Sequence, residues 1–171
     1  MTAPTAKVLT PVREKLWTAL RGWNQYTEKI QWFAESDAEV RYFLQNDASL
    51  SRCPLITARW REFNPEWWVF SQQEWRVAIE VSVWVPDDRQ TLSQDLLEDV
   101  IDAVFRHEAP GTTAAAPLPT LKSYLCRDPE ILVVAPSIPV EAGIDGKHKL
   151  LQSYVVFGLT VRKDPKLRAT A

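Results

Sequence analysis

The clearest pattern in the chain is a strict alternation of apolar and mostly polar residues from Trp75 to Val85. Every second position of this stretch carries Trp, Val or Ile, and the positions between them carry mainly Arg, Glu, Ala and Ser. Successive side chains of a β-strand point to opposite faces of a sheet, so the pattern predicts a long strand with one buried face. Pro86 is expected to end this strand, because proline has no backbone N–H to donate.

A second strand is predicted before this one. The segment from Leu55 to Phe63 alternates loosely, with Ile56, Ala58 and Trp60 on one face. The sequence Asn64-Pro65-Glu66 that follows is typical of a turn. We therefore expect this strand to end near Phe63 and to be followed by the long alternating strand.

Two more strands are predicted in the C-terminal third. Ile131 to Ala135 indicates a short strand, and Pro136 and Pro139 confine its continuation to a sheet edge or take it out of the sheet. Asp145-Gly146 is a favourable hairpin turn. The alternation from Leu151 to Val161 then predicts a last strand.

Apolar residues at helical spacing predict two long helices. The first is expected from Thr10, as the N-cap, to about Gly22, with Pro11 in its first turn. The second begins at the capping-box sequence Thr91-Leu92-Ser93-Gln94 and runs to Phe105. Its apolar stripe is expected to pack on the sheet. Two interpretations stay open for Trp23 to Asn46: a short helix capped by Asp37, or an irregular, aromatic-rich connection.

The order of these elements predicts an α+β fold, with one antiparallel or mixed β-sheet and two main α-helices packed on one face. A length of 171 residues fits one domain. We expect a flexible tail at residues 1–9, a single domain at 10–163 and a second tail at 164–171. Within the domain, residues 106–130 are proline-rich and weakly patterned, which predicts an extended loop or arm.

Composition and charge narrow the function. The net charge is -2, so a sequence-independent nucleic-acid surface is not indicated, and sequence-specific binding is not expected either. No apolar run reaches the roughly 20 residues that span a bilayer, and the N-terminus lacks a signal-peptide pattern. We expect a cytosolic protein without membrane contact. Cys53 and Cys126 are then more consistent with free thiols than with a disulfide.

The sequence offers little for catalysis. Phosphate-binding loops, zinc-protease motifs and nucleophile elbows are missing, and Gly is scarce. His107 and His148 lie in polar contexts without a recognisable nucleophile or orienting carboxylate. Their spacing to Cys53 and Cys126 matches no zinc-ligand pattern. We therefore expect no catalytic, cofactor-binding or metal-binding residues, no bound cofactor and no enzymatic activity.

Three groups of residues are candidates for protein–protein contact. Trp67, Trp68 and Phe70 cluster beside a predicted hairpin end, where a small domain cannot easily bury them all. Charge also separates along the chain. An acidic helix face, opposed to a basic C-terminal part, suits head-to-tail assembly of identical subunits, although ordinary surface charge explains it equally well. The charged candidates are Asp95, Asp99, Asp102, Lys147 and Lys149.

The whole order of elements resembles the bacteriophage tail terminator family, which includes the lambda-like and siphophage tail terminators. The resemblance covers about residues 10 to 163 and lies in the first amphipathic helix, the strands ending in Trp75 to Val85, the acidic helix after "WVPDDRQTLSQ" and the closing strand "LLQSYVVFGLTVRKD". The segments from Trp23 to Asn46 and from Ala109 to Pro129 are longer than the minimal pattern of the family.

The resemblance implies a structural virion protein that acts by binding alone. Members of this family form a ring, usually a hexamer, which caps the tail tube and provides the surface for head–tail joining. The implied partners are further copies of the chain, the tail tube protein and a head-completion or neck protein. The implied location is the head–tail junction of the virion, after synthesis in the host cytoplasm. Three alternatives are another neck or tail-completion component, a non-viral adaptor that binds a partner on its sheet, and an enzyme with an unrecognised site.

Overall fold

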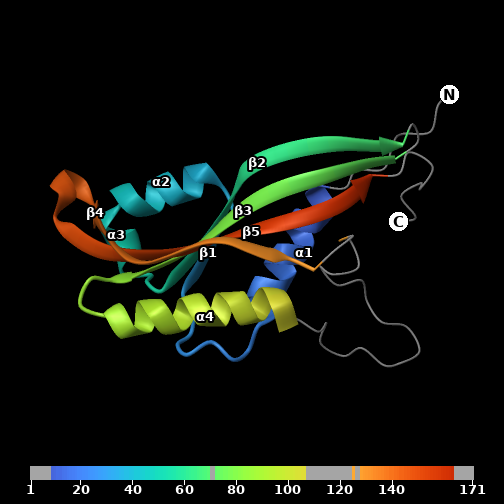
Figure 1. Cartoon of the computed structure of the whole chain (residues 1–171). Coiled ribbons are helices and arrows are strands. Elements are labelled where there is room, and N and C mark those ends of the chain that lie inside the picture. The colour runs from blue at the N-terminus through green and yellow to red at the C-terminus, as the bar shows by residue number, and fades with distance from the viewer. Residues whose placement is uncertain (1–8, 70–71, 107–124, 126–127, 164–171) are drawn as a thin grey trace.

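The protein folds around one five-stranded β-sheet (Figure 1). This computed structural model describes residues 9–69, 72–106, 125 and 128–163. The strands lie in the order β1-β2-β3-β5-β4. β1 runs parallel to β2, and the other neighbouring pairs are antiparallel. The strands are β1 (Trp32–Ala34), β2 (Leu55–Val69), β3 (Gln72–Pro86), β4 (Glu130–Ala142) and β5 (His148–Lys163).

Four α-helices accompany the sheet in the described residues. They are α1 (Leu9–Gly22), α2 (Asp37–Gln45), α3 (Asp47–Leu50) and α4 (Gln90–Arg106). A single 3₁₀ turn, Ile144–Gly146, joins β4 to β5. The expected α+β class with a mixed sheet is therefore confirmed. The long helices α1 and α4 and the strands β3 and β5 correspond to the four strongest patterns in the sequence.

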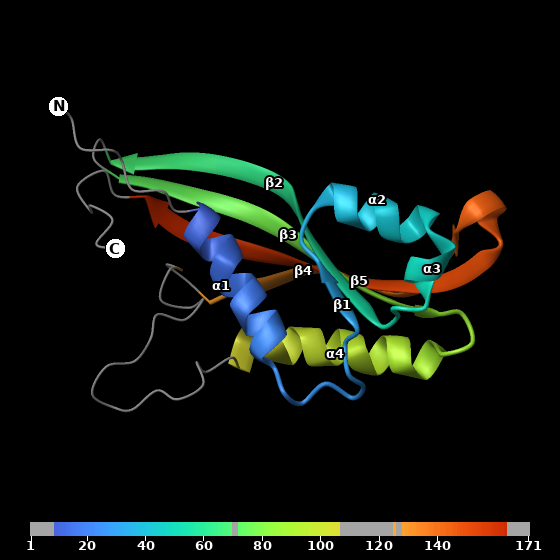
Figure 2. The ribbon, with the colours of Figure 1, turned by 180° about the vertical axis from the view of Figure 1, so that it is seen from behind.

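The larger core lies between one face of the sheet and the two long helices. Alternate residues of β3, from Val77 to Val85, are buried there, and the residues opposite them on β5 share their face. α1 contributes Val12, Leu16 and Leu20 to the same cluster. The apolar stripe of α4 completes it with Leu92, Leu96, Leu97, Val100, Ala103 and Val104. Figure 2 shows α1 and α4 together on this side of the sheet.

A second, smaller core lies on the opposite side of the sheet. Trp84 points there, because it alternates with Val83 and Val85 along β3. Its indole meets the ring of Phe43 from α2 edge-on, with 6.4 Å between the ring centres. Figure 1 shows α2 and α4 on opposite sides of the sheet. The helices are therefore not all on one face, and the sequence pattern did not predict this second core.

The short helix α2 confirms one of the two interpretations of the segment before Asn46. Its N-cap is Ser36 and not Asp37, which is the first helical residue. The Ser36 hydroxyl accepts a hydrogen bond from the Glu39 backbone N–H, and the Glu39 carboxylate accepts one from the Ser36 N–H. This reciprocal pair is a capping box, and it fixes where the helix begins.

Four boundaries differ from the sequence prediction. α1 begins at Leu9, so Thr10 lies inside its first turn and is not the cap. The turn predicted at Asn64-Pro65-Glu66 is wrong, because β2 continues through it to Val69 and pairs with β3. Pro65 is tolerated there because no described strand lies on the outer side of β2 at that point. The strand predicted at Ile131 to Ala135 extends to Ala142 along the sheet edge. α4 begins at Gln90, so Thr91 lies inside its first turn and is not the cap.

Candidate functional site

The strand β4 exposes a run of four apolar residues. Ile131, Leu132, Val133 and Val134 leave 44, 52, 45 and 48% of their surface exposed. β4 ends the sheet on this side, so its outer edge has no strand neighbour among the described residues. An unpaired edge with apolar side chains is a favourable surface for pairing with another chain.

These side chains emerge on both faces of the sheet. Ile131 and Val134 lie opposite Phe157 and Val155, so they share the face that α1 and α4 cover. Leu132 and Val133 occupy the other face. The side chain of Leu132 lies across Gly158, where a Cβ would meet it at 3.2 Å. Irregular pairing occurs at Leu132 and again between Ala135 and Ile138, close to the two prolines.

The opposite side of the sheet has a second unpaired edge, on β2. The short strand β1 covers only Leu55 to Thr57, so the outer edge of β2 has no described strand neighbour from Ala58 onward. A groove of about 470 Å³ begins at this point, between α1 and the start of α2. Its lining comprises Arg13, Leu16, Trp17, Glu35, Ser36, Asp37, Ala58, Arg59, Trp60, Arg61 and Ile79.

The groove contains an unsatisfied donor. The indole Nε1 of Trp17 is buried, and it has no hydrogen-bond partner among the described residues. Trp17 itself is held firmly: its ring stands edge-on to Phe33, and the Arg21 guanidinium lies 5.4 Å from its centre. A buried indole N–H usually has a partner, so this donor is a local cost within the packing of α1.

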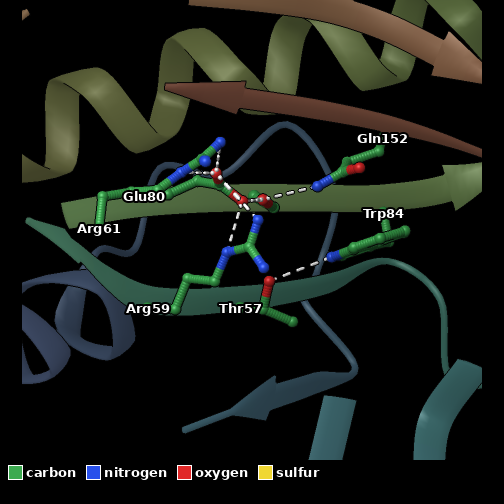
Figure 3. Close-up of polar contacts among 7 residues, drawn as sticks. Thr57, Arg59, Arg61, Glu80, Trp84 and Gln152 are labelled. Atoms are coloured by element: carbon green, nitrogen blue, oxygen red, sulfur yellow. Dashed lines mark hydrogen bonds and ion pairs between the residues drawn. The ribbon is translucent and has the colours of Figure 1, made fainter. Parts of the chain in front are cut away.

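A buried carboxylate lies beside this groove on the other face of β2 and β3 (Figure 3). Glu80 is only 3% exposed, whereas Arg59 and Arg61 are 55 and 46% exposed. Arg59 donates from Nε and Nη2 at 3.1 and 3.3 Å, and Arg61 from Nε at 2.6 Å. The Ser82 hydroxyl donates to the same carboxylate at 3.2 Å. Glu80 therefore fixes two guanidinium groups on β2 at the surface.

The polar contacts continue toward the second core. The Gln152 amide nitrogen donates to the Ser82 hydroxyl at 3.0 Å, and the Trp84 indole donates to the Thr57 hydroxyl at 3.1 Å. Figure 3 shows the Gln152 contact joined to the Glu80 group and the Trp84 contact with Thr57 apart from it. Each of these two bonds joins neighbouring strands, so together they hold the strands in register next to the unpaired edge of β2.

The interface residues expected from sequence lie in three places. Trp67 and Trp68 belong to the last part of β2, but their side chains, and all of Phe70, are outside the described residues. Lys147 and Lys149 are exposed around the start of β5. Asp95, Asp99 and Asp102 lie on α4.

The acidic residues of α4 are not equivalent. The Asp99 carboxylate accepts hydrogen bonds from the backbone N–H and the hydroxyl of Thr27, at 2.7 and 2.8 Å. This carboxylate ties the connection after α1 to α4. Burial, and then the nearby charge of Asp99, raise the pKa of Tyr26 well above its usual value. An interface role for Asp99 remains a prediction, and its carboxylate already serves an internal contact.

Two groups considered for chemistry have unremarkable surroundings. Burial raises the pKa of the Cys53 thiol to about 11, so it is protonated at neutral pH. His148 Nε2 lies 3.5 Å from Asp47, on the surface of the turn before β5. His107 and Cys126 lie outside the described residues. Among those described, no group of three His, Cys, Asp or Glu side chains is placed to hold a metal ion.

The sequence did not single out β4 or the groove beside Ala58 as candidate contact surfaces. The only signal for β4 was an unbroken apolar run directly before two prolines. No helix of the described chain is both long and apolar enough to cross a bilayer. No model of a known protein family matches the sequence, and no curated protein matches it.

Proposed function

We propose that this chain is a structural subunit that assembles with copies of itself, and that it serves as the tail terminator of a bacteriophage. The observation that carries the proposal is the edge strand β4, with its four half-exposed aliphatic residues in sequence. Edge strands of monomeric proteins are usually protected by charges, by prolines or by a covering element. β4 has prolines only in its second half, and no described element covers the edge at Ile131 to Val134.

The free energy available from covering the exposed residues of β4 supports an assembly surface. Fully burying an aliphatic side chain is worth about 1.5–3 kcal/mol, so covering the exposed half of one gains roughly 1 kcal/mol. Four such residues together offer about 4 kcal/mol to a partner that covers them. Exposed apolar side chains along an unpaired strand edge favour a partner that adds a strand and covers both faces.

The tail terminator role rests on the resemblance in element order together with this surface. In that role the chain forms a ring, usually a hexamer, that caps the tail tube and presents the surface for head–tail joining. Its partners are then the tail tube protein and a head-completion protein, and it works at the head–tail junction of the virion. Binding carries this function, and no catalytic step is required.

The first test is the mass of the protein in solution, measured by light scattering from low to high concentration, with negative-stain images of the same samples. A closed ring with a central hole is the expected result, alone or after tail tube protein is added. A chain that stays monomeric in both conditions would contradict the proposal. It would favour the alternative of an adaptor that binds one different protein through β4.

A further inference from the structure

We infer that the first part of β4, Glu130–Val134, of one copy docks as an additional antiparallel strand on β2 of a second copy, from Ala58 onward, in the groove between α1 and α2. This inference rests on the proposed self-assembly and names both sides of the contact. β4 ends the sheet on one side, and on the other side β2 has no described strand neighbour beyond its pairing with β1 at Leu55–Thr57. One kind of contact therefore uses both unpaired edges.

Strand directions are compatible with this contact. β2 pairs antiparallel with β3, β3 with β5 and β5 with β4, so β4 runs opposite to β2 within one copy. If the sheet of the second copy continues that of the first with the same face on the same side, β4 lies antiparallel to the neighbouring β2. The junction then repeats the antiparallel pairing found in the rest of the sheet, and two different edges meet. β1 already occupies β2 at Leu55–Thr57, so only Glu130–Val134 pair, and β4 has to turn away after Val134, where its own pairing is irregular between Ala135 and Ile138.

Apolar residues match on the face that carries α1 and α4. Ile131 and Val134 point to that face on β4, and Ala58 and Trp60 point to it on β2. In a continuous sheet these side chains become cross-strand neighbours. Trp17 lines the groove on this side, so it lies beside the docked strand together with Ala58 and Trp60.

Charges match on the other face. Glu130 lies there on β4, because it pairs with Gly158, and it is exposed. On β2 the same face carries Arg59 and Arg61, both about half exposed. Arg59 gives Glu80 only two of its three nitrogen atoms, so it retains donors for a second carboxylate. An antiparallel docking brings the acidic start of β4 to a basic edge.

Pairing of two β4 edges with each other is the main competing arrangement. It would cover the apolar run, but it would leave the groove beside Ala58 open, and it would bring no basic residue from β2 to Glu130. A contact between two different surfaces repeats from copy to copy and yields a ring or a filament, whereas a contact of one surface with itself ends at a dimer. The two arrangements can be separated by mixing variants.

The experiment uses one variant for each side of the contact. Leu132→Lys with Val134→Lys places a charge on each face of β4, and Ile144→Lys, at an apolar residue that is 60% exposed, is its matched control. Asp37→Trp fills the groove from an exposed position that lines it, and Ala38→Trp, at the next exposed position of α2, is the control. Mass is measured for each variant alone and for the equimolar mixture of the two docking variants.

We expect both docking variants to be monomeric alone and to form a one-to-one dimer when mixed, since each supplies the edge that the other has lost. The two controls are expected to assemble as the wild type does. If the Asp37→Trp variant dimerises alone while the β4 variant does not, β4 pairs with itself and the inference is overturned. Oligomers of wild-type size in both variants would keep the self-assembly and also overturn this contact. A wild type that is monomeric at every concentration, both alone and with tail tube protein, overturns the self-assembly itself.

Crosslinking gives a second readout that does not depend on blocking variants. A benzophenone side chain is placed at Val133, which is 45% exposed, and the protein is mixed with isotope-labelled copies before irradiation. Capture of labelled β2 peptides that contain Arg59 or Arg61, which lie on the face to which Val133 points, supports the inference. Capture of labelled β4 peptides, or no capture between copies at any concentration, overturns it.

Discussion

The ion pairs between Glu80 and its two arginines predict that loss of the arginines destabilises the protein more than loss of the carboxylate does. Replacing Arg59 and Arg61 together with Gln leaves a carboxylate that is 3% exposed without a cationic partner. Breaking a buried ion pair in this way costs about 3–5 kcal/mol, because the remaining charge stays out of water. Glu80→Gln removes the buried charge instead. The two guanidinium groups are about half exposed and can turn into solvent, so this change costs only about 1–2 kcal/mol.

Urea denaturation and thermal melting of the three variants would measure this difference. For a chain of this length, 1 kcal/mol changes the melting temperature by about 2–4 °C, so the double arginine variant should melt roughly 6–20 °C below the wild type. Adding Glu80→Gln to that variant should restore part of the loss, because no buried charge is left unpaired. The reasoning is refuted if Glu80→Gln alone is the more damaging change, or if it restores nothing in the arginine background.

Three further predictions concern single side chains. Val81→Asp places an unpaired carboxylate in the larger core and should abolish cooperative unfolding; a wild-type melt would contradict the assigned face of β3. Tyr26 has a raised pKa and donates to the Leu20 carbonyl oxygen at 2.6 Å. Its contribution is full below pH 10 and is lost at higher pH, where the unfolded phenol ionises first. Tyr26→Phe should flatten that fall in unfolding free energy, and an unchanged slope would exclude this cause. The Cys53 thiol has a pKa of about 11, two units above the usual 9.0. In a Cys126→Ser background, it should therefore be alkylated about 100-fold more slowly in the folded protein than in the denatured chain. The reaction is measured by intact mass, and equal rates would contradict the burial of Cys53.

Much of the fold could be predicted because its longest elements each bury a single face. The alternation from Trp75 to Val85 gave β3 almost completely, and the stripe from Leu92 to Phe105 gave α4. The segments that were missed depend on distant partners. β1 has three residues and exists only through parallel pairing with β2. The second core brings Phe43 to Trp84, and no local pattern connects residues so far apart in the chain.

The candidate surface was harder to predict than the fold. An unbroken apolar run such as Ile131 to Val134 is typical of a buried strand, and only the order of strands reveals that it lies at an edge. Glu80 occupies a position that alternates with buried residues, so its pattern indicates a solvated side chain. Its charge is paired by Arg59 and Arg61 from the neighbouring strand, and no pattern within β3 predicts these partners. Trp67 and Trp68 stay untested as contact residues.

The placement of two cores on opposite faces of β3 constrains how the chain can evolve. A deletion of one residue within β3 would exchange the positions of Val83 and Trp84 between the two sides of the sheet, so neither core would receive side chains that fit. β2 differs, because its irregular pairing between Trp60 and Glu62 already accommodates one additional residue. Natural variants of this protein are therefore expected to carry length changes in β2 or in the connections, and none in β3.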